Sequence, residues 1–263
     1  MQTFTREMLL AHNRRAWDQH VDNGYRWTIP VDEKQVSEAR EGRLCLVLTP
    51  SLPVPDDWFP VLKKAKVLCL ASGGGQQGPL LAAAGADVIV LDNSPRQLQQ
   101  DRAVAEREGL ELETLQGDMR DLSMFESETF DLIFHPSSNA YIPDVRPVWQ
   151  EAYRVLKKGA FLLSGFTNPV RYLFDRVGYE TGNLVVKHKI PYSDLEVLSE
   201  EEIARRNEQG ITLQFAHTLD DHIGGQIAAG FAITGFYEDR YGETDPLSGY
   251  IASFIATKAT KTG

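Results

Sequence analysis

A run of glycines carries the clearest chemistry in this sequence. Residues 73–78 are Gly-Gly-Gly-Gln-Gln-Gly, and they directly follow the apolar run at residues 67–70. Because glycine has no side chain, such a loop lets backbone N–H groups come close to a bound ligand. Asp92 follows about twenty residues later, where a carboxylate can accept hydrogen bonds from ribose hydroxyls. The spacing predicts a site for a nucleotide-containing cofactor, and taken alone it is the pattern of a dinucleotide site.

Further polar residues follow later apolar runs. His135 ends a predicted strand, at the edge over which ligands lie in open α/β sheets, and an imidazole there can orient or deprotonate a nucleophile. We therefore take His135 as the candidate catalytic residue. The alternative is a strand-end histidine whose ring is satisfied by the protein itself. The residues expected to face a substrate are Ser138, Asn139 and Tyr141, in the loop after His135, and His217.

The segment His217-Thr-Leu-Asp-Asp-His222 has the residue types of a metal site. Asp220 and Asp221, however, stand where a helix is expected to begin, and the helix dipole favours carboxylates at that position. We predict no metal ion.

The elements that must position these residues alternate between strands and helices. A helix over residues 5–22 and a short one over 33–42 come first, followed by a βαβ unit that starts near Lys66. An irregular segment at 168–215 precedes a helix over 219–230 and two closely joined strands, which favours antiparallel pairing. The seven predicted strands are 67–70, 86–91, 111–116, 130–135, 160–166, 232–237 and 251–258. The other predicted helices are 79–84, 95–108, 144–157 and, within the irregular segment, about 199–207.

Composition narrows the class of partner. The 263 residues contain 27 Lys and Arg against 37 Asp and Glu, and a net charge of -10 repels a phosphate backbone. We therefore expect no nucleic acid and, because no long apolar run occurs, no membrane. Cys45 and Cys69 lie in apolar runs and are predicted to be buried free thiols, which fits the cytoplasm. Oligomeric state cannot be predicted from this sequence.

Two cofactor classes share the glycine loop, and the end of the sheet distinguishes them. A dinucleotide fold needs a second mononucleotide-binding half, whereas this chain ends in the predicted antiparallel pair. Residues 67–75, Val-Leu-Cys-Leu-Ala-Ser-Gly-Gly-Gly, resemble the first motif of class I S-adenosylmethionine (SAM)-dependent methyltransferases. Residues 90–94, 116–119, 130–135 and 151–160 resemble the motifs that follow it, in the same order. The resemblance covers residues 60–166 and recurs near 228–258.

The resemblance implies a Rossmann-like α/β fold. Its sheet is mostly parallel and seven-stranded with an antiparallel last strand, and helices lie on both faces. Residues 1–60 are expected to form an N-terminal helical cap, residues 61–263 the SAM-binding domain, and residues 168–215 an insertion at the acceptor site, whose aromatic content favours an apolar or aromatic acceptor. The implied cofactor contacts are Ala71, Ser72, Gly73, Gly75, Asp92, Asn93, Gln97, Gly117, Asp118, Met119 and His135.

Two positions depart from the family pattern. Cys69 stands where the family usually has an acid, and Ala71 where it usually has a glycine. A slightly different loop is expected, with Ser72 or a backbone carbonyl in compensation. The implied function is methyl transfer from SAM to a small molecule, which releases S-adenosylhomocysteine (SAH). The alternatives are an NAD(P)-dependent oxidoreductase and a non-catalytic SAM-binding protein.

Overall fold

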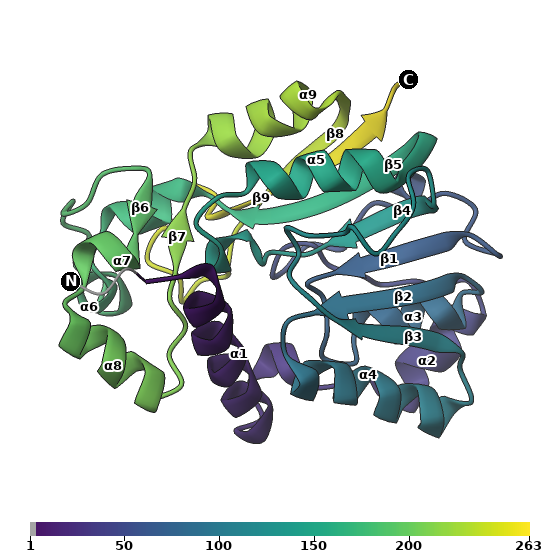
Figure 1. Cartoon of the computed structure of the whole chain (residues 1–263), viewed down its shortest axis with the longest axis horizontal. Helices are drawn as coiled ribbons and strands as arrows, with labels where there is room; N and C mark the ends of the chain where they lie inside the picture. Colours follow the sequence, from purple (N-terminus) through teal and green to yellow (C-terminus); the bar gives the residue numbers. More distant parts are fainter. Residues whose placement is uncertain (1–3) are drawn as a thin grey trace.

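The computed structural model describes residues 4–263 and is built on a seven-stranded sheet of order β3-β2-β1-β4-β5-β9-β8 (Figure 1). Strands β1 to β5 pair in parallel, and β9 is antiparallel to both of its neighbours. This confirms the predicted mostly parallel sheet with an antiparallel last strand. The strands are β1 (Lys66–Leu70), β2 (Asp87–Asp92), β3 (Leu112–Gln116), β4 (Phe130–His135), β5 (Leu156–Thr167), β8 (Phe231–Asp239) and β9 (Phe254–Lys261).

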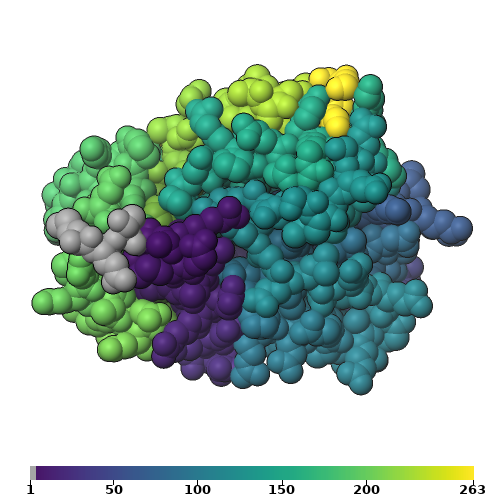
Figure 2. All heavy atoms as spheres, in the orientation of Figure 1, coloured from purple at the N-terminus to yellow at the C-terminus, as the bar shows by residue number. Residues whose placement is uncertain are grey.

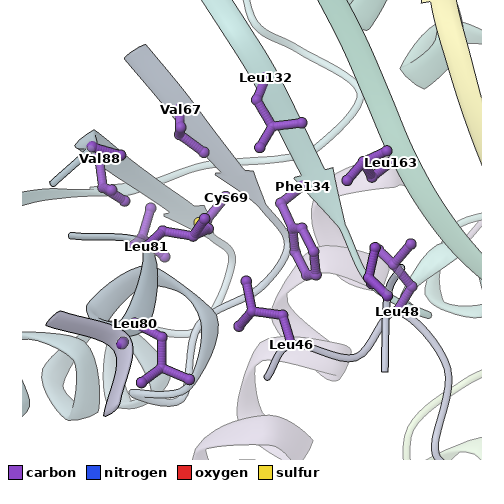
Figure 3. Close-up of a cluster of buried hydrophobic side chains, with 14 of the residues drawn as sticks. Leu46, Leu48, Val67, Cys69, Leu80, Leu81, Val88, Leu132, Phe134 and Leu163 are labelled. Carbon is purple, nitrogen blue, oxygen red and sulfur yellow. The ribbon is translucent and has the colours of Figure 1, made fainter. Parts of the chain in front are cut away.

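One face of the sheet is covered by α2 (Glu33–Arg40), α3 (Gln77–Ala83) and α4 (Pro95–Glu108). Alternate strand residues such as Val67 and Cys69 point toward these helices, because side chains in a strand alternate between the two faces. Figure 3 shows Leu46 and Leu48, from the chain before β1, packed beside Phe134 of β4. Residues 33–58 therefore contribute to the sheet's own core, and the domain boundary at residue 60 stays a prediction.

The opposite face is covered by α5 (Arg146–Val155) and α9 (Gly225–Ala229) (Figure 1). Trp149 of α5 is fully buried there against the other set of strand residues, which includes Leu68, Leu70 and Ile133. Helices on both faces are thus confirmed. Trp149 also donates a hydrogen bond from Nε1 to the carbonyl of Asp221, which ties α5 to the π-helical turn η5 (Asp220–Gly224) before α9.

Helix α1 (Arg6–Asp22) and the insertion lie at the carboxyl ends of the parallel strands (Figure 1). Thr5 caps α1 by accepting a hydrogen bond from the Met8 N–H. In Figure 2, α1 lies at the surface between the insertion and the residues of the sheet domain. The remaining elements are the helices α6 (Arg176–Glu180), α7 (Asp194–Val197) and α8 (Glu200–Glu208), the short strands β6 (Tyr192–Ser193) and β7 (Phe215–Ala216), and the 3-10 turns η1 (Arg26–Thr28), η2 (Asp56–Trp58), η3 (Asn139–Tyr141) and η4 (Pro169–Leu173).

Three local predictions were wrong. Strand β5 begins at Leu156 rather than residue 160, because Lys157 stays in the sheet and forms an ion pair with Asp131 of β4 at 2.8 Å. Strand β9 begins at residue 254 rather than 251, and the Ser253 hydroxyl just before it donates a hydrogen bond to the Asp245 side chain instead. Cys45 is exposed, whereas Cys69 is buried. Within residues 4–263, no helix is long and apolar enough to cross a membrane.

Candidate functional site

A cavity of about 570 Å³ opens where β1 to β5 end, between the strand ends, α1 and the insertion. Parallel strands bring their carboxyl ends to one edge of a sheet, and ligands bind at that edge. Of the residues predicted from the sequence, the cavity wall includes Ala71, Ser72, Gly73, Asp92, Asn93, Gln97, Gly117, Asp118, Met119, Ser138 and Tyr141. Gly75, His135, Asn139 and His217 are not part of the wall.

The glycine loop is closely packed against its surroundings. A Cβ atom on Gly73 would come within 2.8 Å of the Gln97 Cβ, and Gly74 has a φ of +116°, which disfavours any L side chain. Ala71 has a φ of +49°, so an alanine adopts the left-handed conformation that glycine favours. Ala71 therefore holds this position in a left-handed backbone conformation, and the expected difference from the family's loop stays a prediction.

Asp92 ends β2 beneath the glycine loop. One carboxylate oxygen accepts the Gly73 N–H at 3.0 Å, and the other accepts the Ser94 N–H at 2.8 Å. Burial raises the pKa of the Asp92 carboxyl, and the bonds from Ser94 and Gly73 oppose that shift. Each carboxylate oxygen keeps a further lone pair for a ligand hydroxyl. The Asp92 side chain can therefore hold the loop in place and bind a ligand in the cavity at the same time.

A second acid, Asp101 of α4, was missed by the sequence analysis. Its carboxylate is fully buried and accepts the Gly74 N–H at 3.0 Å. Burial raises the pKa of Asp101 to about 8, although the bonds from Gly74 and Gly75 act in the opposite direction. The carboxyl also lies near the Cys69 thiol, whose pKa is raised first by burial and then by Asp101. Asp101 of α4 thus accepts a hydrogen bond from the loop beside Cys69. The sequence analysis instead expected Ser72 or a backbone carbonyl to compensate for the departures from the family pattern.

Asp118 lies in the cavity wall but is already held by arginines. Arg120 donates to both carboxylate oxygens, with a shortest distance of 2.7 Å, and Arg6 of α1 donates from Nε at 2.8 Å. Burial alone would raise the pKa of Asp118, but the bonds from Arg120 and Arg6 outweigh it and the pKa is lowered. A ligand amino group that used this carboxylate would have to displace Arg6, whose side chain is 47% exposed.

Neighbouring residues complete this part of the wall. Asn93 donates from its side-chain amide to the Leu10 carbonyl of α1 at 2.8 Å, so it holds the helix over the cavity. The Gln97 side-chain oxygen and the Ser72 hydroxyl are buried and have no hydrogen-bond partner among residues 4–263. Such buried groups are normally paired, which is consistent with a ligand satisfying them. Met119 supplies an apolar side chain.

His135 lies under the sheet edge rather than in the cavity. Its ring is fully buried, with Nδ1 2.8 Å from the Leu70 carbonyl oxygen and Nε2 2.7 Å from the Asn139 side-chain amide. Burial lowers the pKa of His135, so the ring is neutral, and a neutral ring donates from one nitrogen only. The ring N–H is donated either to the Leu70 carbonyl or to the Asn139 side-chain oxygen, each of which lies within hydrogen-bond distance of one ring nitrogen. This placement supports the alternative of a satisfied strand-end histidine instead of a catalytic one.

His217 shares this buried cluster, because its Nε2 lies 3.1 Å from the Asn139 carbonyl oxygen. Burial lowers the pKa of His217, and His222 packs edge-on against its ring. Neither Asn139 nor His217 therefore supports the acceptor-facing role predicted for it. Over the described residues 4–263, no group of three or more His, Cys, Asp or Glu side chains is arranged to hold a metal ion.

Replacing His135 by glutamine tests the structural role. We expect the free energy of unfolding to fall by about 1–3 kcal/mol, because the buried Leu70 carbonyl and the Asn139 side-chain oxygen lose the ring that lies between them. Urea unfolding measures this loss, with the half-buried His188→Gln as the matched control. A His135→Gln protein as stable as the native chain would contradict the role.

Aromatic residues that the sequence analysis did not assign as contacts line the rest of the cavity. Trp17 of α1 packs edge-on against Tyr141, with ring centroids 5.3 Å apart, and Tyr25 and Trp27 extend this wall. The imidazole in the wall is His20, and burial lowers its pKa. Spacing on α1 could have identified His20, because positions 17 and 20 share a helix face with Asn13. The insertion and the chain near β9 add Arg171, Tyr172, Phe174, Tyr179, Tyr192, Tyr241 and Phe254.

The strand order and the glycine-loop site together define the class I methyltransferase fold, and similar proteins agree. A family model described as a methyltransferase domain matches residues 68–164. The uncharacterized methyltransferase YbaJ of Bacillus subtilis is 52% identical over 253 residues, which cover 96% of this chain and 98% of that protein. A sterol 24-C-methyltransferase of Aspergillus fumigatus is 33% identical over 97 residues, which cover 36% of this chain and 26% of that protein.

A solved structure, an S-adenosylmethionine-dependent methyltransferase from Mesorhizobium loti, superposes with a TM-score of 0.60 at 18% identity. The match covers 78% of this chain and 94% of that chain, and at this identity it shows the fold alone. The chain belongs to the SAM-dependent methyltransferases. It is a methyltransferase and its cofactor is SAM. The family and the fold therefore exclude the alternative function of an NAD(P)-dependent oxidoreductase.

Proposed function

We propose that this enzyme transfers the methyl group of SAM to a small-molecule acceptor and releases SAH. The observation that carries the proposal is the single cavity that joins the glycine loop to the aromatic insertion. Its volume of about 570 Å³ lies within the range of roughly 300–1,000 Å³ that is typical of small-molecule sites. The net charge of -10 argues against a nucleic-acid acceptor.

The donors and acceptors in the wall fit SAM. Asp92 would accept hydrogen bonds from the ribose hydroxyls, and Met119 would pack against the adenine. The unpaired oxygens of Ser72 and Gln97 and the backbone of residues 71–73 would bind the polar parts. Asp118 would receive the adenine amino group in place of Arg6. When bound, SAM supplies an electrophilic methyl group on a sulfonium.

The remaining residues would position the acceptor and exclude water. Helix α1 closes the cavity, since Asn93 and Arg6 connect it to the strand ends. Holding the acceptor in line with the methyl group requires no covalent intermediate with the protein. An acceptor that must lose a proton could give it to His20, because burial keeps that imidazole neutral at neutral pH. The match to the sterol 24-C-methyltransferase covers 36% of the chain and does not define the acceptor.

Calorimetric titration of the purified protein with SAM, SAH and NADH tests the cofactor site. We expect binding of SAM and SAH in the micromolar range and none of NADH. Binding of NADH without SAH would contradict the proposal. Binding of SAH with no turnover of SAM across a wide panel of small molecules would contradict the proposed small-molecule acceptor.

A further inference from the structure

Arg171, in turn η4 at the end of β5, extends into the part of the cavity formed by the insertion. Its guanidinium carbon lies 4.9 Å from the ring centroid of Tyr179, 5.6 Å from that of Tyr241 and 5.7 Å from that of Phe254. Aromatic faces attract cations, and the three rings hold the guanidinium in a defined position. The arginine is therefore fixed in the acceptor end of the cavity.

The charge of Arg171 has no acidic partner among residues 4–263. The other arginines in the cavity wall are paired: Arg206 contacts Asp194 at 2.7 Å, and Arg176 contacts Glu180 at 2.8 Å. No salt bridge or side-chain hydrogen bond within the described chain involves Arg171. A half-buried guanidinium that has lost water and gained only aromatic faces is a strong donor for a planar anion.

Tyrosines surround this cation. The phenol groups of Tyr25, Tyr141 and Tyr172 lie close enough to Arg171 for its positive charge to counteract the rise in their pKa values that burial causes. Burial raises the pKa of Tyr172 to about 12, so this hydroxyl stays protonated, and it donates a hydrogen bond to the Gln214 side-chain oxygen at 3.1 Å. The rings also present flat apolar surface, which favours stacking of a planar ligand.

We propose that the methyl acceptor is a planar aromatic acid whose carboxylate forms an ion pair with Arg171 while its ring stacks among the tyrosines of the insertion. This inference rests on the proposed function, because it names the acceptor class for the same cavity. The carboxylate would be bound by the guanidinium fork through two parallel hydrogen bonds. Arg171 would thus determine specificity for the acceptor, and its role is distinct from binding of the cofactor.

The test uses a matched pair of probes, naphthoate and the neutral naphthamide, titrated by calorimetry into the protein saturated with SAH. We expect naphthoate to bind at least tenfold more tightly than naphthamide, since a charge-assisted hydrogen bond is lost with the amide. Arg171→Gln should reduce naphthoate affinity to that of naphthamide, and Arg171→Lys should give an intermediate value. The matched control is Arg205→Gln, an exposed arginine on α8.

The outcomes separate the inference from the proposed function. Equal binding of acid and amide to the native protein would overturn the inference without depending on any variant. A tenfold loss of SAH affinity in Arg171→Gln would also overturn it, because the arginine would then bind the carboxylate of the cofactor. Absence of SAH binding to the native protein would instead contradict the proposed function.

Discussion

Replacing Asp92 by asparagine is expected to weaken SAH binding about a hundredfold or more. The carboxylate already accepts the Gly73 and Ser94 N–H groups, and in the proposed function its remaining lone pairs would accept the ribose hydroxyls. The asparagine has the same shape, but an NH₂ group replaces one carboxylate oxygen. This NH₂ group would face a backbone N–H, so one loop contact and one ligand contact are lost. A hydrogen bond to a charged group contributes about 1.5–3 kcal/mol, and two weakened contacts give an effect of this size.

Calorimetry with SAH measures the affinity, and thermal unfolding verifies that the variant is folded. The matched control is Asp87→Asn, at the exposed start of the same strand, which should bind SAH like the native protein. Unchanged affinity in Asp92→Asn would remove Asp92 from the cofactor site and with it the proposed position of the ribose.

The fold and the glycine loop were predictable because their determinants are local in sequence. Apolar runs of five or six residues, each followed by a helix, define strands β1, β2 and β4, and one helix and one strand separate Gly73 from Asp92. Accordingly, the cavity is lined by Asp92 at the end of β2 and by Ala71 and Gly117, which directly follow β1 and β3. The antiparallel β9 was predictable as well, since the connection from β8 contains Gly242, Pro246 and Gly249 and no helical pattern.

The orientation of His135 depends on the pleat and could have been derived. His135 shares the side of β4 with Ile133, and that side is covered by α5, so the ring is directed under the sheet toward Trp149. A polar residue at a strand end contacts a ligand only if the alternation of the strand directs its side chain toward the cavity. Counting alternate residues along β4 places the His135 side chain on the face that α5 covers.

The cavity's acceptor end was beyond sequence reasoning for a different reason. Arg171, Tyr25 and Tyr241 come from segments far apart in the chain, and their proximity depends on how the insertion folds back over α1. Sequence analysis identified the aromatic insertion but not the cation within it. Asp101, by contrast, could have been noticed, because it occupies the buried face of α4 with Leu98 and Ala105.

Replacing Asp101 by asparagine is expected to remove a pH dependence of stability. The pKa of Asp101 is raised to about 8 in the folded protein, against 3.8 in the unfolded chain. Between these values the folded state binds a proton that the unfolded state lacks, so stability is greatest at low pH and falls as pH rises toward 8. The slope for this one group approaches about 1.4 kcal/mol per pH unit. The side chain of the asparagine variant does not titrate, so this slope should disappear.

Urea unfolding of the native protein and Asp101→Asn between pH 5 and pH 8 measures the difference, with Asp87→Asn as the control. The asparagine can still accept the Gly74 N–H, so SAH affinity at neutral pH should stay within a few-fold of the native value. Asp101→Leu removes that acceptor and should weaken SAH binding as well. Parallel stability curves for the native and asparagine proteins would mean that Asp101 is ionised when folded, and the glycine loop would then rest on a buried carboxylate anion.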